Sequence, residues 1–222
     1  MPGPFVLSAA RAAAVERAMR AAAAAPSWRY PWRDLDADLR QRGRASFPCV
    51  GYGSLVNAAS ASRTLGTASQ VLVVAFGVRR LFNYEMPDGA SQYGPPVERR
   101  ARAALNVRAT GRHGDMVNGV LFDVALEDVP AFREREIGYD LVPVACLKWN
   151  RPDGEPFLAY ILSCPDEERA GAVRTRADIE PHRAYYAACR DGAASCGDEF
   201  LHVWLATTFL ADGITPMTEW ER

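Results

Sequence analysis

The tetrad Tyr52-Gly53-Ser54-Leu55 is the part of this chain best suited to chemistry. It follows residues 47–51, an apolar run that predicts a strand ending at the tetrad. Glycine accepts positive φ and lets other groups approach its main chain closely. A turn of this kind can aim several backbone N–H groups at one point and bind an anion. The tetrad is therefore a candidate carboxylate or phosphate site; the alternative interpretation is a strand followed by a tight turn.

A second candidate is Glu136, the last acid of the charged run 133–136. It follows a helix predicted over 126–135 and precedes an apolar strand predicted over 141–149. An acid at a helix C-terminus is mildly unfavourable, because the helix dipole is negative there. Partial burial beside the strand would raise its pKa and let it take and return a proton near neutral pH. The alternative is that the run 133–136 is a solvated charged turn.

These motifs, taken in order, resemble those of the γ-glutamylcyclotransferase-like family. In that family a Tyr-Gly-Ser-Leu or Tyr-Gly-Ser-Asn turn ends the first strand. A Leu-x-x-x-Glu segment then supplies the catalytic acid; here Phe132 holds the leucine place and Glu136 falls four residues later. Between the tetrad and this Glu136 segment, residues 117–122 look like the family's Gly-x-Val/Leu-Tyr/Phe strand. The resemblance covers roughly residues 47–210.

A third match lies downstream, where the family places a tyrosine seven residues before Gly-Ala and a further glycine five residues on. Tyr185, Gly192-Ala193 and Gly197 fit this spacing. Any one of these motifs is weakly specific, whereas three in the right order are moderately specific.

The resemblance implies cleavage of a γ-glutamyl amide without water, in which the substrate's α-amine attacks its own γ-carbonyl and releases 5-oxoproline. It implies Glu136 as the catalytic acid and base. It also implies substrate binding by Tyr52, Gly53, Ser54, Leu55 and Tyr185, with Tyr52 packing mainly beneath the turn. Neither a metal nor a cofactor is implied, and the partner is a small γ-glutamyl molecule.

The chain departs from the family pattern in four ways. It carries an extension over 1–45 and a long loop over 85–100, and leucine rather than asparagine follows Ser54. An extra residue, Ile137, separates the catalytic position from Gly138-Tyr139, which leaves Glu134 as a second candidate acid. The loop and the extension leave open which γ-glutamyl compound is the substrate.

The elements that must position these residues indicate an α+β fold. We predict an N-terminal helical extension over 1–45 and one domain over 46–222. Strands are predicted over 47–52, 71–82 (with Gly77 as a bulge), 103–109, 117–124, 141–149 and 157–163, and helices over 179–190 and 197–210. This order favours a curved, mostly antiparallel sheet or small barrel with flanking helices.

Composition narrows the function classes. The net charge of −1 gives no general attraction to nucleic acid or to an anionic membrane. No run of about 18 apolar residues predicts a membrane span. The five cysteines are odd in number and form no C-x-x-C pair, which indicates a reducing, cytoplasmic location. The oligomeric state stays open.

Two other functions compete with catalysis by Glu136. The same fold could bind a γ-glutamyl or amino-acid group without turnover, with the arm at 1–45 as a partner surface. A serine hydrolase would use Ser54 with His113, His182 or His202 as base, but the usual Gly-x-Ser-x-Gly turn is absent. The histidines and unpaired cysteines show no metal-ligand spacing.

Overall fold

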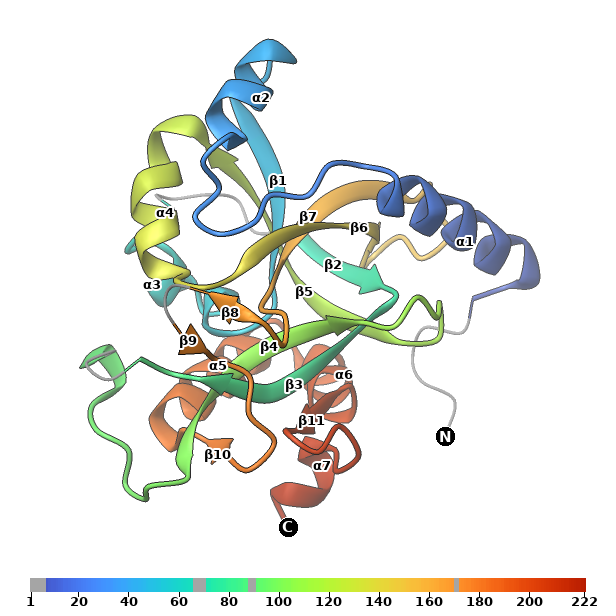
Figure 1. Cartoon of the computed structure of the whole chain (residues 1–222). Helices are drawn as coiled ribbons and strands as arrows, with labels where there is room; N and C mark the ends of the chain where they lie inside the picture. The colour runs from blue at the N-terminus through green and yellow to red at the C-terminus, as the bar shows by residue number, and fades with distance from the viewer. Residues whose placement is uncertain (1–6, 66–70, 88–90, 170–171) are drawn as a thin grey trace.

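A closed five-stranded barrel and a smaller four-stranded sheet form the centre of the molecule in this computed structural model (Figure 1). The structure describes residues 7–65, 71–87, 91–169 and 172–222. Strand order in the barrel is β1-β5-β2-β6-β7, and in the second sheet β10-β4-β3-β11. Most pairings are antiparallel, with β1–β7, β10–β4 and β11–β3 parallel. The predicted α+β class with a curved, mostly antiparallel sheet is confirmed.

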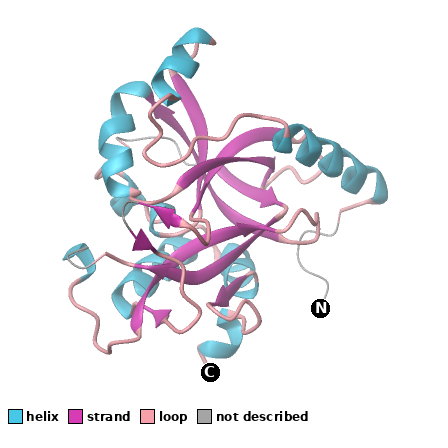
Figure 2. Cartoon of the chain, in the orientation of Figure 1, coloured by secondary structure: helices cyan, strands magenta, loops and turns pink. Residues whose placement is uncertain are grey.

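Figure 2 distinguishes the helices from the strands by colour. The helical elements are α1 (Ala9–Ala23), α2 (Leu35–Gln41), η1 (Ser54–Val56), α3 (Ala58–Ala61), η2 (Ser91–Tyr93), η3 (Leu126–Asp128), α4 (Val129–Arg135), α5 (Arg183–Ser195), α6 (Asp198–Ala206) and α7 (Met217–Trp220). The strands are β1 (Ser46–Gly51), β2 (Val71–Phe76), β3 (Val78–Glu85), β4 (Ala101–Ala109), β5 (Met116–Ala125), β6 (Asp140–Lys148), β7 (Phe157–Ser163), β8 (Glu168–Arg169), β9 (Ala172–Val173), β10 (Glu180–Pro181) and β11 (Thr208–Leu210).

The predicted continuous strand over 71–82 is wrong, because Gly77 divides it. Gly77 has φ +78°, a left-handed conformation that L side chains rarely adopt. The chain turns there, so that β2 lies in the barrel while β3 lies in the second sheet. Gly77 is thus a corner between two sheets rather than a bulge within one.

The C-terminal segment also differs from its prediction. Helical spacing predicts one helix over 197–210, but α6 ends at Ala206 and residues 208–210 form β11 beside β3. In Figure 1, α5, α6 and α7 lie together at the end of the molecule that carries the second sheet. The predicted helix over 179–190 begins later, at Arg183, because residues 180–181 pair with β4.

Residues 7–45 pack on the barrel through aromatic and aliphatic side chains. Ser8 caps α1 by accepting a hydrogen bond from the Arg11 N–H. Trp28 pairs with Leu141 of β6, and Trp28 and Trp32 are buried in the main hydrophobic core. The division into domains at residue 45 stays a prediction, and residues 1–6 lie outside the described part.

Two further observations concern the described residues. None of their helices is long and apolar enough to span a bilayer. Of the predicted loop over 85–100, residues 88–90 lie outside the described part, and the rest contains the short helix η2.

Candidate active site

The tetrad lies where the sequence predicts it, between the end of β1 and η1. Within the described residues, the backbone N–H groups of Gly53, Ser54 and Leu55 donate to no other protein group. The first N–H groups of a helix have no intrahelical acceptor, and η1 begins at Ser54. Three adjacent donors therefore stay available to an anion at this turn.

Gly53 is required by the close approach of another side chain. Its φ is −111°, so the positive φ that glycine would permit is not used. A Cβ at this position would lie 2.5 Å from the hydroxyl oxygen of Tyr185 on α5. The glycine thus lets the phenol of Tyr185 reach the turn.

A fully buried arginine holds the turn from below. The guanidinium of Arg80 donates to the carbonyl oxygen of Tyr52 (3.1 Å), which also accepts from the indole N–H of Trp204 (3.2 Å). Its other acceptors are the Asn118 carbonyl and amide oxygens, the Trp204 carbonyl, and the Thr207 and Thr208 hydroxyls. Burial lowers the pKa of Arg80 to about 9. Arg80 therefore fixes the tetrad to α6 and β5.

Substituting Arg80 by methionine should lower the free energy of unfolding by about 3 kcal/mol or more, because several buried acceptors would lose their donors. Denaturant titration followed by tryptophan fluorescence measures this change. Arg79→Met is the matched control: Arg79 is the neighbouring residue, but it is partly exposed and pairs with Asp115. We expect the free energy of unfolding of the control to fall by about 1 kcal/mol or less. Equal falls in the two variants would mean that the buried hydrogen bonds of Arg80 stabilise the fold no more than the contacts of Arg79 do.

Glu136 lies at the C-terminal cap of α4 with only 14% of its side chain exposed. Gly138, with φ +81°, turns the chain directly after it, and Tyr139 then begins the approach to β6. Burial raises the pKa of the Glu136 carboxyl, and the neighbouring guanidinium of Arg135 opposes that rise. The carboxyl is thus poised to titrate above the range of an exposed glutamate.

Two hollows lie beside Glu136, and they share part of their lining. A cavity of about 510 Å³ is bordered by Ser54, Glu136, Tyr139 and Tyr185, and its outer part by Arg63, Thr64, Tyr84, Met86, Pro87, Gln92, Tyr93, Ala104, Glu134, Arg135 and Ile137. A second hollow of about 30 Å³ is bordered by residues 51–55, Leu105, Glu136, Tyr139, Leu162 and Tyr185. Glu136, Ser54, Tyr139 and Tyr185 border both. The carboxyl and the donor turn therefore share one site.

The predicted site residues occupy distinct places around this site. Tyr52 packs beneath the turn, as expected, and its hydroxyl donates to the Leu162 carbonyl (2.7 Å). Leu55 is buried against Gly51, and a Cβ added to Gly51 would lie 2.5 Å from the Leu55 Cβ. Tyr185 accepts a hydrogen bond from the Leu105 N–H (3.4 Å). Glu134 is exposed and borders only the outer cavity, so it is the less favourable of the two acids.

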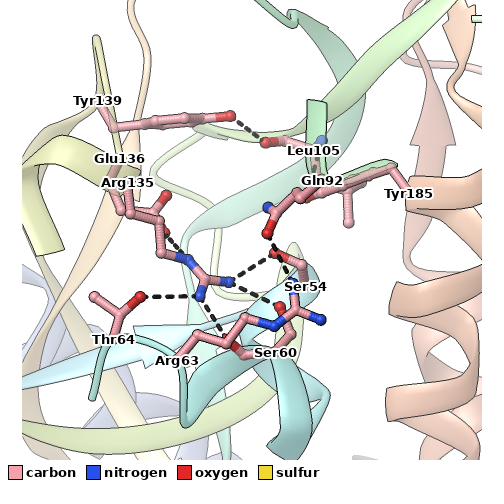
Figure 3. A network of polar contacts seen from close by, with 10 residues as sticks. All are labelled: Ser54, Ser60, Arg63, Thr64, Gln92, Leu105, Arg135, Glu136, Tyr139 and Tyr185. Atoms are coloured by element: carbon pink, nitrogen blue, oxygen red, sulfur yellow. Dashed lines mark hydrogen bonds and ion pairs between the residues drawn. The ribbon is translucent and has the colours of Figure 1, made fainter. Parts of the chain in front are cut away.

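Arg135 is the site residue that the sequence did not reveal. Its Nε donates to Glu136 Oε1 (3.0 Å) and its Nη2 to Ser54 Oγ (3.1 Å), so one guanidinium touches both halves of the site (Figure 3). The sequence interpretation of 133–136 as a solvated turn holds for Glu134, whereas Arg135 and Glu136 are nearly buried.

The serine-hydrolase arrangement is not formed. The Ser54 hydroxyl accepts from Arg135, and no histidine is among the described residues that border either hollow. His182 instead caps α5 and His113 pairs with Glu16, while His202 is exposed. Over the described parts of the chain, no group of three or more His, Cys, Asp or Glu side chains is arranged to hold a metal.

Comparison with known proteins relates the fold to solved structures. No family model matches the chain, and no curated protein matches it. YkqA from Bacillus subtilis matches with a TM-score of 0.52 at 14% identity, over 75% of this chain and 55% of YkqA. The chain thus corresponds to about half the length of YkqA.

Two further structures match over most of their own length. The γ-glutamyl cyclotransferase specific to glutathione from yeast has a TM-score of 0.50 at 13% identity, over 80% of this chain and 100% of the yeast chain. This chain has the γ-glutamylcyclotransferase-like fold. The uncharacterized human protein loc79017 matches with a TM-score of 0.50 at 14% identity, over 74% of this chain and 89% of the human one. At these identities the γ-glutamylcyclotransferase-like fold is shown, and the reaction is a separate question.

Proposed function

We propose that this protein is an enzyme of the γ-glutamylcyclotransferase type, which converts a γ-glutamyl amide to 5-oxoproline and a free amine. The observation that carries the proposal is that a nearly buried carboxyl and three backbone donors, which have no partner among the described residues, border one hollow. The larger cavity of about 510 Å³ falls in the size range of small-molecule sites.

The reaction needs few groups, because the attack is intramolecular and the enzyme mainly holds the folded-back conformer. The Glu136 carboxylate takes a proton from the substrate's α-ammonium. The freed amine attacks the γ-carbonyl carbon, and its nitrogen then carries one more proton than the lactam keeps. Glu136 returns the first proton to the leaving nitrogen as the bond from that nitrogen to the carbonyl carbon breaks. Glu136 then passes the second proton from the ring nitrogen to the leaving amine, so that the products are the neutral lactam and an ammonium group with the charge of the original α-ammonium.

The turn supplies the fixed polar groups. The N–H groups of Gly53, Ser54 and Leu55 bind the substrate's α-carboxylate or its carbonyl oxygen, without ordering a side chain. Tyr185 closes the hollow from α5, where burial raises its pKa well above the usual value and keeps the phenol protonated as a donor.

The outer cavity offers a place for the leaving group. Arg63 borders it, is exposed, and donates to the neutral amide oxygen of Gln92 (3.0 Å). A carboxylate is a stronger acceptor for a guanidinium than an amide oxygen is. We therefore expect leaving groups that carry a carboxylate, as in γ-glutamyl amino acids and peptides, to bind better than simple amines.

Replacing Arg63 by glutamine should raise KM for a γ-glutamyl amino acid by about 10-fold, the equivalent of ~1.4 kcal/mol. The KM for a γ-glutamyl alkylamide of similar size should stay unchanged, since its leaving group has no carboxylate for Arg63 to bind. Steady-state kinetics of both substrates measure this, with Arg44→Gln as the control, because Arg44 is exposed and borders neither hollow. An equal change in KM for both substrates would show that Arg63 does not recognise the carboxylate of the leaving group.

The proposal is tested by incubating the purified protein with a panel of γ-glutamyl amino acids, peptides and amines and measuring 5-oxoproline by mass spectrometry. Formation of 5-oxoproline from at least one of them, and its loss in Glu136→Gln, is the expected result. Tight binding without any lactam, unchanged in Glu136→Gln, would instead identify a γ-glutamyl-binding module.

A further inference from the structure

The guanidinium of Arg135 uses every one of its N–H groups. Its five donors go to the Glu136 carboxylate through Nε, and through the two Nη atoms to Ser54 Oγ (3.1 Å), Ser60 Oγ (3.0 Å), the Ser60 carbonyl (2.6 Å) and Thr64 Oγ1 (3.3 Å). Figure 3 shows Glu136 above the guanidinium, Thr64 on its left, and Ser54 and Ser60 on its right. Arg135 is therefore held by the protein and has no free N–H group for a ligand.

The acceptors belong to segments that are far apart in the sequence. Ser54 begins η1, Ser60 lies in α3, and Glu136 caps α4, so Arg135 reaches across 81 positions to Ser54. The side chain of Arg135 is only 12% exposed, as is typical of an arginine that has a fixed conformation and many partners. A planar guanidinium fixes the directions of its acceptors more strictly than a lysine ammonium does.

We propose that Arg135 is a positioning residue that holds Glu136 and the Ser54 turn in one arrangement across the site, and that it acts on the reaction through Glu136. This inference rests on the proposed function. Arg135 orients the carboxylate and favours its ionised form, in a place where burial favours the neutral acid. The ionised form is the one that accepts the substrate's proton.

Several groups face Glu136 from the surrounding elements, and Arg135 is the one that forms an ion pair with it within the described residues. These titratable and charged groups come from strands, helices and connecting segments on every side of the carboxyl. They are Cys49 of β1, Tyr52 of the tetrad, Arg63 after α3, Tyr84 of β3, Glu134 and Arg135 of α4, Tyr139 before β6, and Tyr185 of α5. Burial raises the pKa values of the tyrosines Tyr52, Tyr84, Tyr139 and Tyr185, so they stay neutral.

The test measures the pKa of Glu136 directly, by carbon-detected NMR titration of the side-chain carboxyl, with Glu136→Gln used to assign its signal. In Arg135→Gln that pKa should rise by about 1 to 3 units, because the adjacent cation is lost. The acidic limb of the kcat/KM profile should move to higher pH by the same amount. In Arg135→Lys the pKa should stay near the wild-type value, while kcat/KM falls, since an ammonium cannot bridge Glu136 and Ser54.

Arg133→Gln is the matched control. Arg133 lies in the same last turn of α4 and carries the same charge, but its Nη1 donates to the Pro31 carbonyl (3.2 Å). This variant should leave both the Glu136 titration and the pH profile unchanged. The proposal is overturned if folded Arg135→Gln titrates like the wild type, or if Arg133→Gln shifts the titration equally.

A second variant covers the case in which Arg135→Gln does not fold. Thr64→Val combined with Ser60→Ala removes acceptors of the guanidinium but leaves its contact with Glu136. This double variant should lower kcat/KM, and normal kinetics would overturn the positioning role. Absence of 5-oxoproline from the wild type at every pH would refute the proposed function alone, because the NMR titration reports on Arg135 without turnover.

Discussion

Glu136→Gln should lower kcat for 5-oxoproline formation by about 10²- to 10⁴-fold, the usual weight of a positioned general acid and base. Glutamine has nearly the same shape and accepts the hydrogen bond from Arg135, but it cannot carry a proton between the two nitrogens. The fold should persist, and the substrate KM should change little. Stopped assays by mass spectrometry, together with thermal melting of the variant, measure these quantities.

The control for this variant is Glu134→Gln on the same helix. Glu134 is exposed and borders only the outer cavity, so its loss should leave kcat near the wild-type value. The opposite pattern, a silent Glu136→Gln and an inactive Glu134→Gln, would transfer the acid to position 134. The wild-type profile should also lose activity on acidification at a higher pH than an exposed glutamate would give, because burial raises the pKa of Glu136.

Gly53→Val should have the second largest effect, with kcat/KM falling by about 100-fold or more. A Cβ at this position lies 2.5 Å from the Tyr185 hydroxyl oxygen, and valine adds two methyl groups beyond it. Either the turn or α5 must move, and a displacement of about 1 Å at a reacting site costs on the order of 10²-fold. Steady-state kinetics and thermal melting of the variant report the two consequences.

Two variants separate this contact from a general effect of valine. Gly114→Val is the control, because a Cβ on Gly114 meets no atom of the described residues within 4 Å and this glycine borders neither hollow. Gly53→Ala combined with Tyr185→Phe is the rescue, since removal of the hydroxyl leaves Leu105 Cδ1 at 3.5 Å as the nearest atom. Stability of this pair should exceed that of Gly53→Ala alone. Additive losses would mean that the hydroxyl does not constrain the glycine.

Much of the fold follows from local patterns in the sequence. Ser8 predicts the start of α1, and the alternating apolar runs predict the barrel strands, because these signals act over a few residues. The errors arise where tertiary structure decides. Gly77 is a bulge or a corner depending on which sheet the next strand joins, and β11 forms because β3 offers a free edge to residues 208–210. The residues next to Gly77 and those at 208–210 do not determine either outcome.

The sequence predicts the tetrad and Glu136 as site residues, but not the contacts of Arg135 that connect them. The tetrad and Glu136 stand out by type and spacing, whereas Arg135 lies in a charged run typical of exposed turns. Its partners Ser54 and Ser60 lie more than 70 positions away. Arg80 follows Arg79 in a strand, so alternation places one of the pair inside. The acceptors that make burial of Arg80 tolerable come from four other segments of the chain.

The most direct test of lactam formation at this site is the reaction of the wild-type protein with a γ-glutamyl substrate in H₂¹⁸O, followed by mass spectrometry of the products. Attack by the substrate's own amine predicts 5-oxoproline without the heavy isotope, and no labelled glutamate. Glutamate that carries ¹⁸O would show that water is the nucleophile, and it would contradict the account given for Glu136 and the Gly53 turn.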